Sequence, residues 1–344
     1  MILVIDKKEI SIRYKTACLY LEKDNRQLQR IPLKQLALVV IYANPLVEVS
    51  VWRYLAHANI PVVMLASRGG QQNAILTGTL ATQLPFRRLQ HKIANDSVMA
   101  LKQAIYFLRI KLESYSLSLT TLEYYYPVKA EDRQSFIKQQ QKTLEKLNTS
   151  KNYQQLMGLE GQLAQAWFAL LAKALPYHLK FAGRNRRPPR DPMNSLLSLA
   201  YTLLMAEIHQ VLISSGLDPS LGFLHQDSPG RESLVLDFTE IFRSGVDSFV
   251  LKWLATTKLD DSSFYYREQQ GCRLSKATRP LFFKAWADYR QQWQHAVINE
   301  TCEQLDDWPD GLLPEQIRWQ IMQWRSYLKE TVNDTPEAKK GDGQ

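Results

Sequence analysis

Hydrophobic and polar positions follow two different periods along this chain of 344 residues. Up to about residue 82, short runs rich in β-branched and aromatic residues alternate with charged turns, a pattern that predicts strands. Beyond Pro85, apolar residues recur at i, i+3 and i+4 over long segments, which predicts helices. The sequence therefore predicts an α+β fold, with a small β-rich N-terminal domain followed by a larger all-α domain.

The expected elements follow one another in this order. Strands are predicted at 2–5, 10–14, 17–21, 26–31, 36–41, 60–65 and 73–80, with one helix at about 45–58. Helices are predicted at 86–125, 131–148, 152–175, 194–215, 231–256, 275–304 and 314–330, and a small hairpin joins 263–266 to 272–274. Asn194 or Ser195 is expected to cap the helix at 194–215, and Gly216 to close it.

These elements divide the chain into four parts. We expect a β-rich domain at 1–82, a linker at 83–92, a helical domain at 93–332 and a polar, disordered tail at 333–344.

Composition narrows the function only slightly. Lys+Arg number 43 against 34 for Asp+Glu, a net charge of +9, which favours a nucleic-acid partner but also fits any soluble basic protein. The three cysteines are scattered and form no C-x-x-C pair, so neither a disulfide framework nor a zinc site is expected, and a reducing cytoplasm is the simplest location. The start resembles no signal peptide, and the longest apolar runs fall short of the roughly 20 residues that span a bilayer, so no membrane association is expected.

Three short stretches carry the candidate chemistry. They are Leu159-Glu160-Gly161, Gly222-Phe223-Leu224-His225 and Asp237-Phe238-Thr239-Glu240, which together offer one imidazole and three carboxylates. Oxygen and nitrogen ligands suit a divalent metal, and a basic chain suits a polyanionic substrate. The residues therefore suggest a metal ion acting on a phosphodiester.

Glu160 and His225 each allow a structural alternative. Glu160 lies in an apolar helical pattern between Gly158 and Gly161, and a glycine inside a helix costs about 1 kcal/mol, which favours close approach of another backbone, a metal or a substrate. A solvent-facing glutamate beside a helix-packing glycine remains the alternative. His225 lies in a loop, where an imidazole can bind manganese, iron or zinc or act as a general base; a hydrogen-bonded turn histidine is its alternative.

Asp237 and Glu240 are spaced i, i+3, so a helix places both carboxylates on one face. Two ionised carboxylates repel each other, which raises a pKa unless a cation neutralises them. A metal ion would do so, and Arg243, one turn beyond Glu240, would do so equally well as a local ion pair on a solvated face.

Four arginines, Arg184, Arg186, Arg187 and Arg190, lie in a proline-bound loop before a long predicted helix. Guanidinium groups match phosphate oxygens, so the loop is a candidate for contact with nucleic-acid phosphates, and we count Arg243 with it. A solvated basic loop is the alternative.

Taken in order, these stretches resemble the CRISPR-associated spacer integrase, the larger, catalytic subunit of the adaptation complex. The resemblance is carried by residues 191–201, 216–225 and 229–243, and the Glu160-Gly161 pair resembles the family's first metal-ligand motif. Glu240 stands where some relatives have aspartate, which lengthens the side chain and keeps an oxygen ligand. The β-rich start and helical remainder fit the family's two-domain architecture.

The resemblance implies a metal-dependent DNA integrase and endonuclease. In such proteins the 3′-hydroxyl of a captured DNA fragment attacks a phosphodiester at a repeat boundary, and no covalent enzyme intermediate forms. It implies that Glu160, His225 and Glu240 ligate magnesium or manganese and that Asp237 lies close by as a supporting acid, the fourth catalytic residue.

The resemblance also implies partners. Family members form homodimers through their β-rich domains, bridged by a small ferredoxin-like subunit. Some carry a fused reverse transcriptase, but this chain has no Tyr-x-Asp-Asp motif, so a reverse transcriptase would be a separate chain of the same system.

Two other functions remain possible from the sequence. A stand-alone nuclease or junction-cleaving enzyme would need the same ligands and differ only in not joining DNA ends. A non-catalytic DNA-binding scaffold would be indifferent to the loss of Glu160 or His225.

Overall fold

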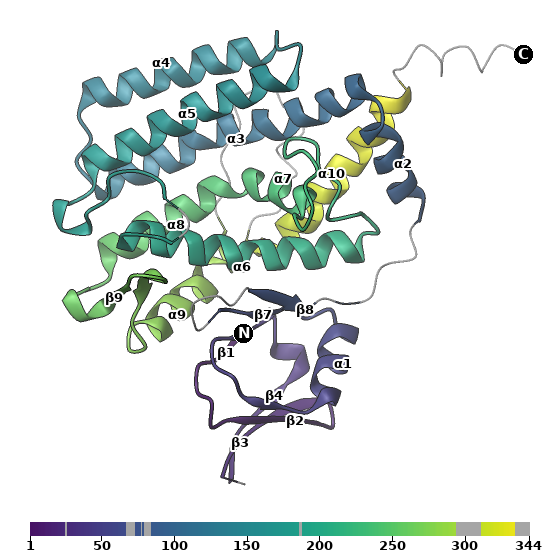
Figure 1. The fold of residues 1–344 in the computed structure, drawn as a ribbon, viewed down its shortest axis with the longest axis vertical. Helices are drawn as coiled ribbons and strands as arrows, with labels where there is room; N and C mark the ends of the chain where they lie inside the picture. Colours follow the sequence, from purple (N-terminus) through teal and green to yellow (C-terminus); the bar gives the residue numbers. More distant parts are fainter. Residues whose placement is uncertain are drawn as a thin grey trace, which may run out of the picture.

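A strand-rich part and a helical part lie at opposite ends of the molecule's long axis (Figure 1). The structure, a computed structural model, describes residues 1–24, 26–66, 73–76, 78, 84–185, 188–293 and 311–333. The predicted α+β class, with strands first and helices after, is confirmed.

Two sheets form the N-terminal part. One has the order β1-β5-β7-β8, with β1, β5 and β7 parallel and β8 antiparallel, and the other has the order β4-β3-β2-β6. The central strand β5 is buried at every residue, as expected of a parallel strand covered on both faces. The bounds are β1 (Ile2–Ile5), β2 (Ser11–Lys15), β3 (Cys18–Lys23), β4 (Arg26–Pro32), β5 (Leu38–Ile41), β6 (Leu46–Val47), α1 (Val49–His57), β7 (Val62–Met64) and β8 (Ala74–Leu76).

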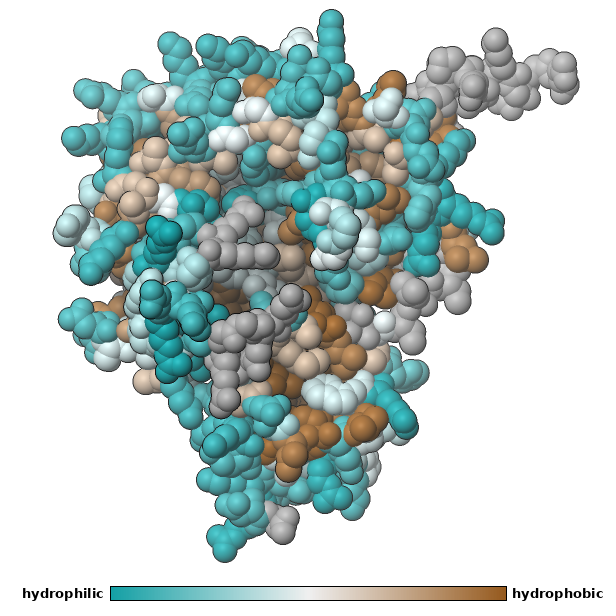
Figure 2. Space-filling model, in the orientation of Figure 1, coloured by the Kyte–Doolittle hydropathy of each residue, from teal (hydrophilic) through white to brown (hydrophobic). Residues whose placement is uncertain are grey.

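Several large apolar side chains of this N-terminal part are exposed. Leu28, Leu46, Val49 and Tyr54 are all exposed, and Figure 2 shows hydrophobic side chains gathered on the visible face of this domain. Large apolar side chains that a small domain leaves exposed to water are typical of an interaction surface.

The helical part forms one large core. Its elements are α2 (Leu84–Ala94), α3 (Ser97–Tyr125), α4 (Ala130–Leu147), α5 (Tyr153–Ala174), α6 (Pro192–Ser214), α7 (Ser233–Ile241), α8 (Arg243–Thr256), α9 (Arg279–Tyr289) and α10 (Leu313–Asn333), with the hairpin β9 (Phe264–Arg267) and β10 (Gly271–Leu274). Helix α3 packs against α5, α7 and α8, and α6 packs against α7 and α8. Residues from α3, α5 and α7 are thereby brought together although they lie far apart in the sequence.

Some predicted helices are divided or begin elsewhere. The helix expected at 86–125 breaks before Asp96, whose carboxylate accepts hydrogen bonds from two backbone amides and caps α3. The stretch expected as a linker is therefore helical from Leu84. The helix expected at 231–256 is interrupted at Phe242.

The cap of α6 is Asp191, neither Asn194 nor Ser195. Its Oδ1 accepts from the Asn194 amide at 2.9 Å, and Pro192 follows in the first turn, where its missing N–H costs nothing. Gly216 closes the helix with a φ of 78°, as expected. Nearly all of the predicted tail, residues 334–344, lies outside the described residues.

Helix α6 is long and apolar enough to cross a membrane, judged by length and composition alone. However, 72% of its most apolar stretch is buried inside the protein, as in a core helix.

Candidate active site

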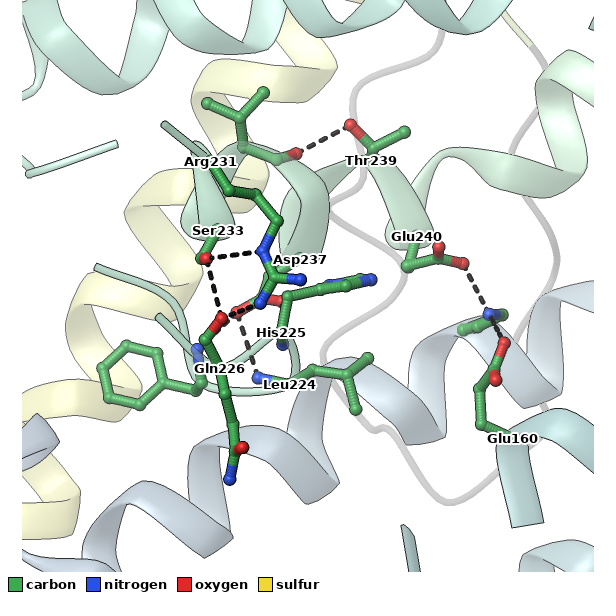
Figure 3. Close-up of polar contacts among 12 residues, drawn as sticks. Glu160, Leu224, His225, Gln226, Arg231, Ser233, Asp237, Thr239 and Glu240 are labelled. Carbon is green, nitrogen blue, oxygen red and sulfur yellow. Dashed lines mark hydrogen bonds and ion pairs between the residues drawn. The ribbon is translucent and has the colours of Figure 1, made fainter. Parts of the chain in front are cut away.

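His225 is fixed by Asp237. The Nδ1 atom of His225 lies 2.8 Å from Oδ1 of Asp237, and the same oxygen accepts the backbone N–H of His225 at 2.8 Å. The other oxygen, Oδ2, accepts the amides of Phe223 at 2.6 Å and Leu224 at 3.1 Å. With Nδ1 donating to a carboxylate, the neutral imidazole presents Nε2 as a free lone pair, and the ring points toward the Glu240 side of the site (Figure 3).

Asp237 has no exposed surface. Burial raises the pKa of Asp237, and the hydrogen bonds from His225 and the backbone oppose that rise. These donors offset part of the cost of burying the carboxylate. The role that the structure gives Asp237 is to hold the histidine and its loop.

The loop before His225 packs closely against the start of α7. A Cβ added at Gly222 would lie 2.6 Å from the Cβ of Ser233, so only glycine fits there. Tyr153, at the start of α5, donates its hydroxyl to the carbonyl oxygen of Leu224. The loop that carries His225 is thus held from two helices.

Glu160 and Glu240 meet at a lysine that the sequence reading missed. Lys111, on α3, is 2% exposed, and its Nζ forms ion pairs with Oε1 of Glu160 and, at 2.7 Å, with Oε2 of Glu240. Figure 3 shows the two glutamates pointing toward one another across these ion pairs. The available signal was a single charged residue on the inward face of the helix, one turn after Phe107 and Leu108.

Arg243 lies beneath the site. Its NH1 lies 2.9 Å from both carboxylate oxygens of Glu240, and the residue is only 5% exposed. Burial alone would raise the pKa of Glu240, but Arg243 and Lys111 more than offset it and hold that pKa well below its usual range. The ion pair considered as an alternative is therefore present, buried rather than solvated. This burial removes Arg243 from the side chains that can contact DNA at the surface.

A polar network supports Arg243 from below. Asp247 accepts the hydroxyl of Tyr201 at 2.7 Å and the indole N–H of Trp167 at 3.0 Å, and all three are buried. The guanidinium of Arg243 lies 5.1 Å from the centre of the Tyr201 ring, a cation–π contact. Asp247 was not singled out by the sequence because it lies in an apolar helix with no neighbouring motif.

The glycines beside Glu160 have no close neighbour in the part of the chain that the structure describes. A Cβ at Gly158 or Gly161 would meet no atom of the described residues within 4 Å, so the expected close approach of another protein backbone is not found among them. The approach of a metal or substrate there stays a prediction.

The donor set suits a hard divalent cation such as Mg²⁺ or Mn²⁺. Oxygens from two helices already converge on one positive charge, and an oriented imidazole is turned toward the same site. Among the described residues no three His, Cys, Asp or Glu side chains form a ready-made metal cluster. The predicted ligands Glu160 and Glu240 are brought together, therefore, around an ammonium that stands where a metal would be expected.

The arginine loop lies beside this network. Arg184 donates to Oδ1 of Asn194 at 2.7 Å and lies 5.9 Å from the centre of the Tyr201 ring, so it is held by α6. Arg190 is exposed, and its backbone N–H donates to the Asn185 side chain at 2.8 Å. Arg186 and Arg187 lie outside the described residues.

Comparison with known proteins identifies the family of this chain. The family profile described as CRISPR associated protein Cas1 matches residues 3–288. The chain is 32% identical over 297 residues to the CRISPR-associated endonuclease Cas1 1 of Thermodesulfovibrio yellowstonii, which covers 84% of this chain and 91% of that protein.

Solved structures share the fold. A casposase bound to its integration product superposes with a TM-score of 0.79 at 21% identity, covering 97% of this chain and 91% of that one. The matching chain of a Cas6-RT-Cas1–Cas2 complex gives a TM-score of 0.75 at 22% identity, covering 96% of this chain and 35% of that one. With the family profile matching most of its length, this chain belongs to the CRISPR-associated Cas1 family.

Proposed function

We propose that this protein is a metal-dependent DNA integrase that inserts captured DNA fragments into a CRISPR repeat array. The observation that carries the proposal is the convergence of Glu160 and Glu240, from different helices, on one cation beside an oriented His225. Membership of the Cas1 family, the endonuclease name of a relative and the fold shared with a casposase support the same conclusion.

In the reaction that we propose, a 3′-hydroxyl of the fragment attacks a phosphodiester of the repeat. A new P–O bond forms as the bond to the departing 3′-oxygen breaks, so the number of phosphodiesters is unchanged and no energy source is consumed. When bound, a magnesium or manganese ion would stabilise the charge that develops on the phosphate oxygens and favour ionisation of the attacking hydroxyl.

The protein's own side chains prepare this site. Glu160, His225 and Glu240 would hold the ion. Asp237 fixes the tautomer and orientation of His225, and Arg243 keeps Glu240 ionised in a buried place.

DNA and protein partners belong to the same proposal. The arginine loop would contact the DNA backbone, with Arg190 exposed for this purpose. The exposed apolar side chains of the N-terminal domain would form a homodimer interface, bridged by a small ferredoxin-like subunit like the Cas2 named in a neighbouring complex. A separate reverse transcriptase is a further candidate partner, and the cytoplasm the expected location.

The test is a joining assay. Purified protein and its small partner would be mixed with a short duplex bearing free 3′-hydroxyls and a supercoiled plasmid carrying the repeat, with magnesium, manganese or EDTA. Glu160→Gln and His225→Ala should abolish joining, whereas Glu145→Gln, an exposed glutamate on α4, should join like the unmodified protein.

Each outcome separates the candidate functions. Metal-dependent joining that needs His225 supports the integrase. Metal-dependent cutting without joining would instead identify a nuclease with the same site. DNA binding that ignores both EDTA and the substitutions would identify a scaffold and overturn the proposal.

A further inference from the structure

Lys111 holds three helices together at the site. Its side chain comes from α3, whereas its two carboxylate partners come from α5 (Glu160) and α7 (Glu240). An ammonium buried to this extent is strongly destabilising unless it is paired, and here two carboxylates pair it. The contact therefore assembles the site without any bound ion.

The same contact blocks the place where a metal would bind. Lys111 engages one oxygen of each glutamate, and those two oxygens are the ones that point toward each other. Arg243 also pairs with Glu240, at 2.9 Å from both of its oxygens, one of which is the oxygen that Lys111 engages. If a divalent ion bound between the glutamates while Lys111 stayed in place, the ion would lie within a few ångströms of the ammonium. Two positive charges repel strongly at that distance in a largely buried site.

We propose that Lys111 is the resident cation of this site and that a divalent ion binds by displacing its ammonium from between Glu160 and Glu240. This inference rests on the metal site of the proposed function. It adds that the divalent ion and the Lys111 ammonium compete for the same two carboxylates. A divalent ion carries twice the charge and can take more oxygen ligands than an ammonium, so it replaces the lysine once its concentration is sufficient.

The first test measures metal affinity directly. Lys111→Met keeps an unbranched side chain of similar length and removes the charge. We expect Mn²⁺, counted as free ion by electron paramagnetic resonance, to bind this variant on the order of tenfold or more tightly than the unmodified protein, because one competing unit charge is gone. Lys173→Met is the matched control, since Lys173 pairs with Asp132 on the surface, 64% exposed, and its loss should leave the affinity unchanged.

Thermal unfolding gives an independent readout. In EDTA, Lys111→Met should melt below the unmodified protein, because Glu160 and Glu240 then repel each other without their shared cation. Added Mn²⁺ should raise its melting temperature by more than it raises that of the unmodified protein.

A second experiment needs no destabilised variant. Protein labelled with ¹³C at the lysine Cε would be titrated with Mg²⁺ and followed by NMR, with the Lys111 resonance assigned by its absence in Lys111→Arg. Displacement predicts that this resonance moves along a saturating curve whose midpoint matches the metal affinity.

The results that overturn the inference are distinct from those that overturn the function. Equal or weaker Mn²⁺ binding by Lys111→Met, or a Lys111 resonance unmoved at saturating Mg²⁺, would show that the lysine does not compete, while the metal site itself stands. Absence of Mn²⁺ binding by both the unmodified protein and the variant would overturn this inference together with the proposed metal site.

Discussion

The Nδ1 atom of His225 lies 2.8 Å from Oδ1 of Asp237, and that carboxylate also accepts three consecutive backbone N–H groups of the loop before α7. One buried side chain therefore sets both the tautomer of the histidine and the path of the loop that carries it. Replacement of such a partner in other metal sites costs 10–100-fold in metal affinity or activity, roughly the range expected here.

Asp237→Asn should accordingly lower both Mn²⁺ affinity and DNA joining by about 10–100-fold while the protein still folds. The amide is a weaker acceptor for the histidine ring and can instead turn an N–H toward it, which favours the wrong tautomer. Asp227→Asn, an exposed aspartate in the same loop, serves as the control. An Asp237→Asn variant that binds Mn²⁺ as tightly as the unmodified protein would show that the pair does not orient the ligand.

Glu240 and Arg243 should be coupled in stability. Glu240→Ala leaves the Arg243 guanidinium buried with its carboxylate partner gone, which typically costs about 3–5 kcal/mol. The double variant Glu240→Leu/Arg243→Met removes both charges and should recover most of that loss. Urea unfolding of the three proteins measures this, and equal stabilities of the single and double variants would contradict the buried pair.

Gly161 in α5 and Gly245 in α8 both lie inside helices but should respond oppositely to alanine. Gly161→Ala adds a methyl group where none of the described residues lies within 4 Å, so the gain in helix propensity should stabilise the protein. That gain is about 0.5–1 kcal/mol. Gly245→Ala places a Cβ 2.3 Å from the ring of Trp293, and this overlap should destabilise the folded protein. Melting temperatures in EDTA test both, and a lower melting temperature for Gly161→Ala would show that some contact occupies that space.

Cys272 should be chemically silent in the folded protein. Burial raises the pKa of its thiol from 9.0 to about 12, so the reactive thiolate is scarce at neutral pH. Because the folded-state pKa is the higher one, the thiol's contribution to stability is complete below pH 9.0 and is lost as pH rises toward 12. Ellman's reagent should modify Cys272 only after denaturation, as peptide mapping would show; rapid modification of the native protein would contradict its burial.

The sequence predicted what is local and missed what is long-range. A period of two against 3.6 was enough for the α+β class and for most of the elements, although β6 (Leu46–Val47) lies in a stretch predicted as helix. The break at Phe242 was missed because apolar residues continue across it. Glu160, His225, Asp237 and Glu240 could be named because their chemistry stands out in apolar surroundings. Lys111 could not, since only the packing of α3 against α5 and α7 brings it there.

The assignment of Arg243 shows the same limit. Spacing alone made a metal ion and a local ion pair with Arg243 equally plausible as the charge that neutralises Asp237 and Glu240. The tertiary structure places the side chain over Tyr201 in the core, which no helical period reveals.

The arginine loop gives the last prediction, on DNA binding. Arg190→Ala should weaken binding by removing one exposed phosphate contact and reduce the slope of log K against log salt by about 0.9. Arg184→Ala should weaken binding more, because its guanidinium also bonds Asn194 and lies over Tyr201, so the loop loses its anchor as well as a charge.

Fluorescence anisotropy with a labelled duplex at several salt concentrations measures both effects, with Lys173→Met as a control for the loss of one surface charge. An unchanged salt slope for Arg190→Ala would place the DNA path away from this loop, while an Arg184→Ala variant matching Arg190→Ala in both slope and melting temperature would show that the anchor contributes nothing.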